Sequence, residues 1–172
     1  HLYALTESGL LAFSRDPDTG ALRQLDGALG CQVAPGSSGP RAATCATAPR
    51  RLGAARDAEA SADWRTLFVA NEAGGVVLLR RDPLSGALSA EAGPGCFGPL
   101  DSGCTTVRGY AYGTRIALTP DERMLVGPAG ALTLGPGGVV NGGGAICIPT
   151  WPPGHCRPVA PADKADQNTV QD

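Results

Sequence analysis

Short apolar runs separated by polar turns follow one another along this chain. Within residues 53–112 they predict four strands, at about 55–61, 66–70, 75–80 and 87–92. The run Val76-Val77-Leu78-Leu79 is apolar at every position, which is typical of a strand covered on both faces. In the turn Asp82-Pro83-Leu84-Ser85-Gly86, Pro83 suits a φ of about −65° and Gly86 a positive φ. The pattern predicts an all-β protein.

This pattern of strands and turns repeats. The segment RDPDTGAL (15–22) returns as RDPLSGAL (81–88), and the dipeptide Gly30-Cys31 corresponds to Gly95-Cys96. A third unit keeps the turn TPDER (119–123), which matches SADWR (61–65), but it lacks the Arg-Asp-Pro hairpin. A fixed period indicates an array of similar modules. The predicted units span about 1–52, 53–112 and 113–160, followed by a polar C-terminal tail at 161–172.

These motifs resemble a known family. The Ser/Thr-x-Asp-x-Arg turn, the strand LFVAN (67–71) and the hairpin RDPxTGAL are similar to the blades of lactonase-type and YVTN-type β-propellers. The resemblance covers residues 1 to about 160 and looks like a secreted bacterial version with cysteine-bridged loops. It implies a partial β-propeller of about three four-stranded blades, the first of which is incomplete.

The incompleteness concerns the first unit and the total number of units. The first unit starts at Leu2, which already belongs to its second strand, and closed propellers typically have four to eight blades. The chain also begins with His1 rather than Met. We therefore expect a fragment, a processed product or an oligomer subunit, completed by another protein chain or a second copy.

The six cysteines fall into three close pairs, and none has the CxxC spacing of a zinc site. Zinc remains the alternative, with His155 as the only nearby histidine, but the even count in local pairs favours disulfides and an oxidising compartment. We expect a secreted or cell-surface protein with the bridges Cys31–Cys45, Cys96–Cys104 and Cys147–Cys156.

Charge and hydropathy exclude two classes of partner. The net charge is −2 and no basic run is present, so nucleic-acid binding is not expected, because phosphate binding requires clustered Lys and Arg. No apolar run approaches the roughly 20 residues that span a bilayer, so no transmembrane segment is expected.

Carboxylates in the hairpin turns are the first candidates for chemistry. Asp16, Asp18 and Asp82 could supply oxygen ligands to calcium, or Asp16 and Asp82 could cap the backbone of their own turns. Leu84 replaces Asp18 in the second copy, which favours capping.

Asp63 and Asp121 occupy the other recurrent turn, beside Arg65 and Arg123. An acid and an arginine clamp could serve catalysis there. An active site is normally single, whereas a structural device repeats, so their recurrence indicates turn stabilisation.

Metal binding at the propeller axis is implied by the resemblance, because some propeller lactonases hold a metal through carboxylate, Asn and His side chains. Asn71, Glu72 and the equivalent Glu7 could contribute, but the segment supplies no full set. The lone His155 has no partner carboxylate or nucleophile nearby in the sequence. No catalytic residue, metal ligand or cofactor is predicted.

Aromatic residues near the cysteine loops are the candidate contact residues: Phe97, Tyr110, Tyr112 and Trp151. They could bind a partner, or they could cover small cores beneath the loops. The sequence favours a binding or scaffolding component. The alternative is a lactonase-like hydrolase to which this chain contributes part of an active site.

Overall fold

The computed structural model describes residues 1–38, 43–48, 52–72, 75–90, 95–98, 104–106, 115–127, 130–134, 140–146 and 157–158. These residues form three β-sheets that follow one another along the chain, and one 3-10 turn, η1 (Gly27–Leu29), lies within the first. The predicted all-β class is therefore confirmed.

Each sheet is built from one predicted unit. The first contains β1 (Leu2–Thr6), β2 (Gly9–Arg15), β3 (Leu22–Gln24), β4 (Cys31–Val33) and β5 (Ala46–Thr47). The second contains β6 (Ala55–Ala60), β7 (Thr66–Asn71), β8 (Val76–Arg81), β9 (Leu88–Ala90), β10 (Cys96–Gly98) and β11 (Thr105–Thr106). The third contains β12 (Ala117–Leu118), β13 (Met124–Gly127), β14 (Gly130–Leu134), β15 (Val140–Ile146) and β16 (Arg157–Pro158).

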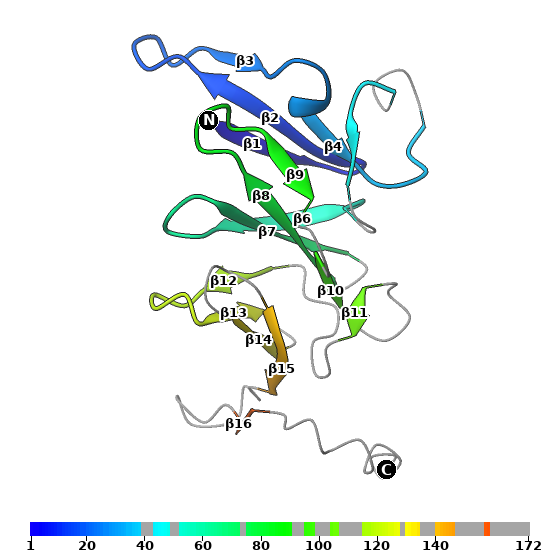
Figure 1. Cartoon of the computed structure of the whole chain (residues 1–172), viewed down its shortest axis with the longest axis vertical. Coiled ribbons are helices and arrows are strands. Elements are labelled where there is room, and N and C mark those ends of the chain that lie inside the picture. Colours follow the sequence, from blue (N-terminus) through cyan, green and yellow to red (C-terminus); the bar gives the residue numbers. More distant parts are fainter. Residues whose placement is uncertain are drawn as a thin grey trace.

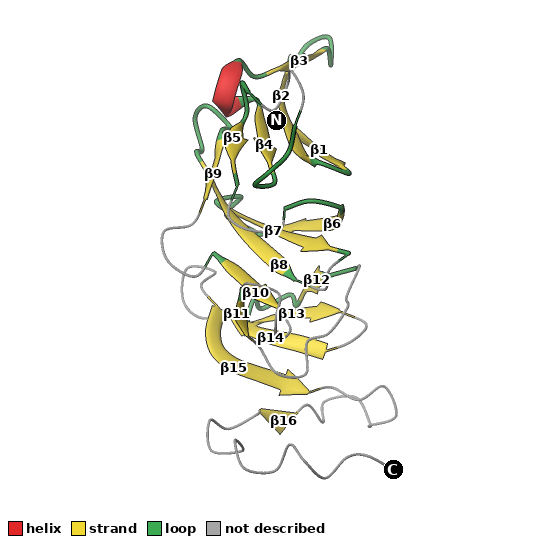
Figure 2. Ribbon diagram, turned by 90° about the vertical axis from the view of Figure 1, so that its right-hand side faces the viewer, coloured by secondary structure: helices red, strands yellow, loops and turns green. Residues whose placement is uncertain are grey.

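The three sheets are stacked face to face along the long axis of the molecule, with the N-terminus at one end (Figure 1; Figure 2). In the described part of the chain the stack is open and does not close into a ring. We call the side of each sheet that faces the N-terminal end its upper face, and the opposite side its lower face.

The central hairpins of the three sheets share one register. Leu2 pairs with Phe13 in the first sheet, Leu67 with Leu79 in the second, and Leu125 with Leu132 in the third. Because side chains alternate between the faces of a strand, repeat-equivalent residues point the same way in every sheet.

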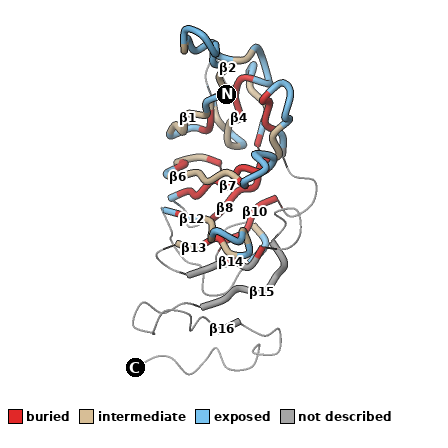
Figure 3. Tube along the Cα trace, turned by 90° about the vertical axis from the view of Figure 1, so that its left-hand side faces the viewer, coloured by how far each residue is buried: buried red, intermediate tan, exposed pale blue. Residues whose placement is uncertain are grey.

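Two apolar cores lie between successive sheets (Figure 3). At the first joint, between sheets one and two, the buried residues are Leu10, Ala48, Leu52, Ala55, Leu67, Val69, Val77, Leu79, Leu88 and Cys96. At the second joint, between sheets two and three, they are Phe68, Ala70, Val76, Leu78, Phe97, Ile116, Leu125, Leu132 and Leu134. The second sheet is covered on both faces, as its continuous apolar run predicts.

The four strands predicted in the second unit are confirmed as β6, β7, β8 and β9, but the predicted count of four strands per unit is wrong, because the sheets have five, six and five strands. In the first two sheets the fourth strand is split. In the first sheet, Leu25 N donates to Ala12 O (3.0 Å) and Ala12 N donates to Gly30 O (2.9 Å), so residues 26–29 loop out. A Cβ added at Gly30 would lie 1.7 Å from Leu25 O, which explains why glycine stands there. In the second sheet, β9 and β10 are the two halves.

A further strand follows the split strand in both sheets. β5 pairs in parallel with β4, and β11 pairs in parallel with β10. The predicted bridges Cys31–Cys45 and Cys96–Cys104 are confirmed, and each ties the start of the split strand's second half to the residue before the parallel strand. The Cys147–Cys156 pair and the tail at 161–172 lie outside the described residues.

The first sheet differs from the other two at one edge. β6 pairs with β7 in the second sheet, and β12 pairs with β13 in the third. In the described part of the first sheet, β1 is an edge strand with no such neighbour.

Candidate functional site: the free face of the first sheet

Within the described part of the chain no sheet covers the upper face of the first sheet, and we call this face the free face. By register it carries Leu2 and Ala4 from β1, Leu11, Phe13 and Arg15 from β2, and Leu22 from β3. Their equivalents on the second sheet, in the same order, are Leu67, Val69, Val77, Leu79, Arg81 and Leu88.

Burial differs sharply between these two equivalent faces. Leu67 is 6% exposed and Leu88 is 4% exposed at the first joint, whereas Leu2 is 41% and Leu22 is 50% exposed on the free face. The chemistry of the two faces is the same, and only the presence of a covering sheet differs. The free face thus presents the same kinds of side chain as the covered face of the second sheet, but leaves them exposed.

Sequence reasoning did not single out Leu2, Arg15 or Leu22 as site residues. A signal was present, because Arg15 and Leu22 belong to the same repeated segment as Arg81 and Leu88. The repeat alone does not show which face of a unit is covered, and the structure supplies that information.

The aspartates of the hairpin turns cap their own backbones. Asp16 Oδ1 accepts hydrogen bonds from the N–H groups of Asp18 (3.0 Å) and Thr19 (2.7 Å), and Asp82 Oδ1 does the same in the second unit. The backbone N–H of Thr19 is the main cause that lowers the pKa of Asp16. These contacts confirm the capping interpretation. Gly20 (φ 74°) and Gly86 (φ 73°) have the predicted positive φ.

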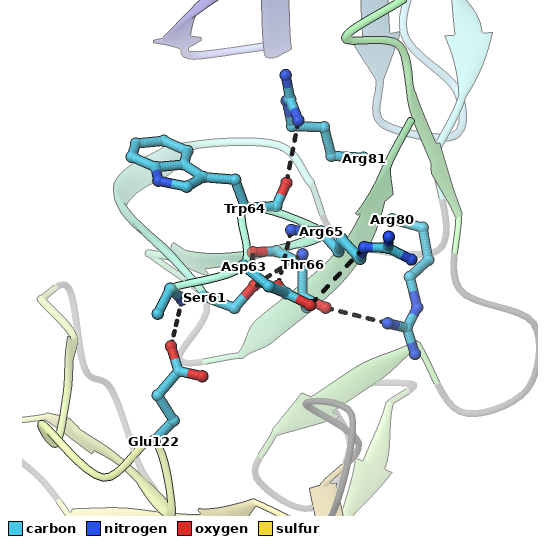
Figure 4. Close-up of polar contacts among 9 residues, drawn as sticks. Ser61, Asp63, Trp64, Arg65, Thr66, Arg80, Arg81 and Glu122 are labelled. Carbon is cyan, nitrogen blue, oxygen red and sulfur yellow. Dashed lines mark hydrogen bonds and ion pairs between the residues drawn. The ribbon is translucent and has the colours of Figure 1, made fainter. Parts of the chain in front are cut away.

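The second recurrent turn is also held by its aspartate (Figure 4). Asp63 Oδ1 accepts hydrogen bonds from Ser61 Oγ (2.6 Å) and from Arg65 N (2.9 Å), and its ion pair with Arg65 spans 4.0 Å. The hydrogen bond from Ser61 is the main cause that lowers the pKa of Asp63. Asp121 repeats this arrangement in the third unit, so both aspartates stabilise turns.

Trp64 and Glu122 occupy the same place in these two turns, and both have left-handed backbones, with φ of 56° and 53°. A Glu122 carboxylate oxygen accepts a hydrogen bond from Ala62 N, so this turn of the third sheet contacts the equivalent turn of the second. The Trp64 ring is exposed and lies apart from the other labelled side chains (Figure 4).

The residues considered for an axial metal make internal contacts instead. Asn71 is fully buried, and its Oδ1 accepts a hydrogen bond from Gly75 N at 3.2 Å. Glu72 pairs with Arg56 at 2.7 Å. For Glu7 the contact is made by the backbone and not by the carboxylate: its carbonyl oxygen accepts a hydrogen bond from Ala54 N at 2.6 Å. Within the described ranges, no three His, Cys, Asp or Glu residues are grouped so as to hold a metal ion.

Of the candidate contact residues, only Phe97 is described, and it is 2% exposed within the second joint. This placement fits the core interpretation, because a side chain buried between two sheets is not available to a partner. Tyr110, Tyr112, Trp151 and His155 lie outside the described residues. Among the described elements, none is a helix with the length and apolarity needed to cross a membrane.

No family model, curated protein or solved structure matches this chain.

Proposed function

We propose that this chain is a binding or scaffolding segment of a secreted β-propeller, completed by further repeat units from another chain or a second copy. The free face carries this proposal. It presents the residue pattern that the second sheet buries at the first joint, yet Leu22 is 50% exposed where its equivalent Leu88 is 4% exposed. Burying the exposed half of such a leucine side chain contributes about 1 kcal/mol, so covering this face is favoured.

The edge of β1, which has no neighbouring strand among the described residues, supports the same conclusion. In the other two sheets the corresponding edge is occupied by β6 or β12. A strand edge with unpaired backbone groups favours the addition of a strand from elsewhere. A unit that covered the free face and supplied this strand would continue the existing stack.

The two disulfides, Cys31–Cys45 and Cys96–Cys104, support the secreted location. Bonds of this kind form and persist in oxidising compartments and are rare in the cytosol.

The native mass of the protein tests this proposal, measured after isolation under non-denaturing conditions from the cells or medium that produce it. We expect a mass above the 17.4 kDa of the chain. Leu22→Glu places a charge on the free face and should return the mass to that of the single chain. Leu84→Glu is the matched control, because Leu84 is 90% exposed in a hairpin turn away from this face. A folded wild-type species at the single-chain mass would overturn the proposal.

A further inference from the structure

The first joint contains a polar contact network among its apolar residues. Arg81 Nε donates a hydrogen bond to the Tyr3 hydroxyl (2.8 Å), which in turn donates to Gly86 O (2.7 Å). Gln32 Nε2 donates to Leu88 O (2.6 Å) across the same joint. Tyr3 and Arg81 are half-buried, and Gln32 is fully buried. Each of these three polar side chains therefore has a partner on the opposite sheet.

The second joint uses apolar side chains at the equivalent positions. Phe68 stands where the first unit has Tyr3, and Phe97 stands where it has Gln32. Leu134 takes the place of Arg81, since both donate their backbone N–H to the arginine that ends the preceding turn. All three side chains belong to the buried core of that joint.

The three positions thus change from polar to apolar together. A guanidinium over Phe68 would lose the hydrogen bond to the phenol and would keep only contacts such as those of Arg81 with Trp64 O and the His1 ring, and a phenol facing Leu134 would lose the hydrogen bond from the guanidinium. A hydrogen bond to a charged group contributes about 1.5–3 kcal/mol, which is enough to disfavour mixed joints.

Arg15 holds the position of Arg81 on the free face. Arg15 pairs with Leu22 in the register in which Arg81 pairs with Leu88. Its side chain is exposed, and within the described part of the chain it makes no side-chain hydrogen bond or ion pair. The guanidinium of Arg15 is therefore exposed on the free face, whereas the equivalent guanidinium of Arg81 binds the hydroxyl of Tyr3.

We propose that Arg15 selects the unit that stacks on the free face. That unit is a further sheet of this repeat, with a hydroxyl-bearing residue such as tyrosine at the position of Tyr3. The inference rests on the proposed function and specifies the partner. A second copy docked through its third sheet would offer Val126 at this position, which has no acceptor for Arg15.

The test adds one unit to the full chain. A copy of residues 53–123 is fused before His1, because residue 124 of the third unit is equivalent to residue 1, and the repeat then continues in its natural order. At the position equivalent to Tyr3, which would face Arg15, the copied unit carries Phe68. Four extended chains are compared. Each has either Arg15 or Arg15→Leu in the original first unit, and either Phe68 or Phe68→Tyr in the added copy. The readout is hydrogen-exchange protection of the β1 and β2 amides.

Two results together are expected. With Arg15 present, Phe68→Tyr in the copy should raise protection roughly tenfold, the effect of one charge-assisted hydrogen bond. With Arg15→Leu, the same change should give no gain or should lower protection. The unextended Arg15→Leu chain is the control, and its stability should match that of the wild type.

The outcomes separate the two proposals. Absence of added protection in all four extended chains would overturn the proposed function, and this inference with it. Equal protection in all four would overturn the role of Arg15 alone, and docking would stand. Assembly of the unextended chain into dimers or longer stacks through its free face would show that a second copy suffices, which also overturns selection by Arg15.

A second measurement uses the unextended chain and the joint that it already contains. Tyr3→Phe and Arg81→Leu should each destabilise the first joint, and the double variant, which copies the Phe68 and Leu134 combination, should recover much of the loss. Strictly additive losses would show that the two positions are not coupled and would overturn the inference.

Discussion

The leucines Leu88 and Leu22 test how much stability one stacked sheet supplies. They occupy the same repeat position, with exposed fractions of 4% and 50%. Leu88→Ala removes a side chain from a closed core, and such a substitution costs about 2–5 kcal/mol through lost burial and a residual cavity. Leu22→Ala removes a half-exposed side chain and leaves no cavity, so roughly half of the 1.5–3 kcal/mol burial term is lost, about 1 kcal/mol. The two variants should differ by at least about 1 kcal/mol.

Urea denaturation of the disulfide-intact chains measures both free energies of unfolding, provided that the slope m stays constant between variants. Leu88 also accepts a hydrogen bond from Gln32, but through its backbone oxygen, which the alanine variant retains. Equal losses for the two variants would show that the free face is already covered in the isolated chain. A loss below about 1 kcal/mol for Leu88→Ala would show that the first two sheets do not pack as described. Either result would refute the argument from equivalent faces.

Three further predictions concern one disulfide and two turns. Replacing Cys31 and Cys45 by serine opens a loop with a sequence separation of 14, which should cost about 3 kcal/mol in a urea titration. Gly86→Val forces a β-branched residue to a φ of 73° against the His1 ring, so its unfolding midpoint should fall by the equivalent of more than about 1 kcal/mol, and an unchanged midpoint would contradict the turn assignment. The pKa of Asp63 is lowered, mainly by the Ser61 hydroxyl, so its stabilising effect is present at neutral pH and is lost as the pH falls below about 4. Asp63→Asn should reduce this acid sensitivity, as followed by circular dichroism against pH.

Features set by neighbouring residues could be predicted from the sequence. The Asp82 turn closes through hydrogen bonds to groups two and three residues away, and Gly86 supplies the positive φ within the same turn. The short-range cysteine pairs were also predictable for the two bridges that the structure describes. Such contacts depend on residue type and spacing, so they recur wherever the motif recurs.

The split strands and the parallel strands were not predicted. β9 and β10 have three residues each, and β11 has two. Segments this short show no measurable alternation of apolar and polar residues. Their pairing depends instead on contacts across the sheet, such as the hydrogen bond from Leu78 N to Gly95 O (2.8 Å).

Which of the two equivalent faces, that of Arg15 or that of Arg81, is covered was decided by tertiary structure alone. The segments that end in Arg15 and Arg81 are equivalent in sequence, so local preferences assign them the same strand and the same turn. Only the stacking of sheets gives Arg81 a phenol to bind and leaves Arg15 facing outward. The sequence by itself thus determined the repeat and its turns, because these depend on contacts between near neighbours. The structure decided which copy of the repeated face is buried, because burial depends on a sheet some sixty residues away in the chain.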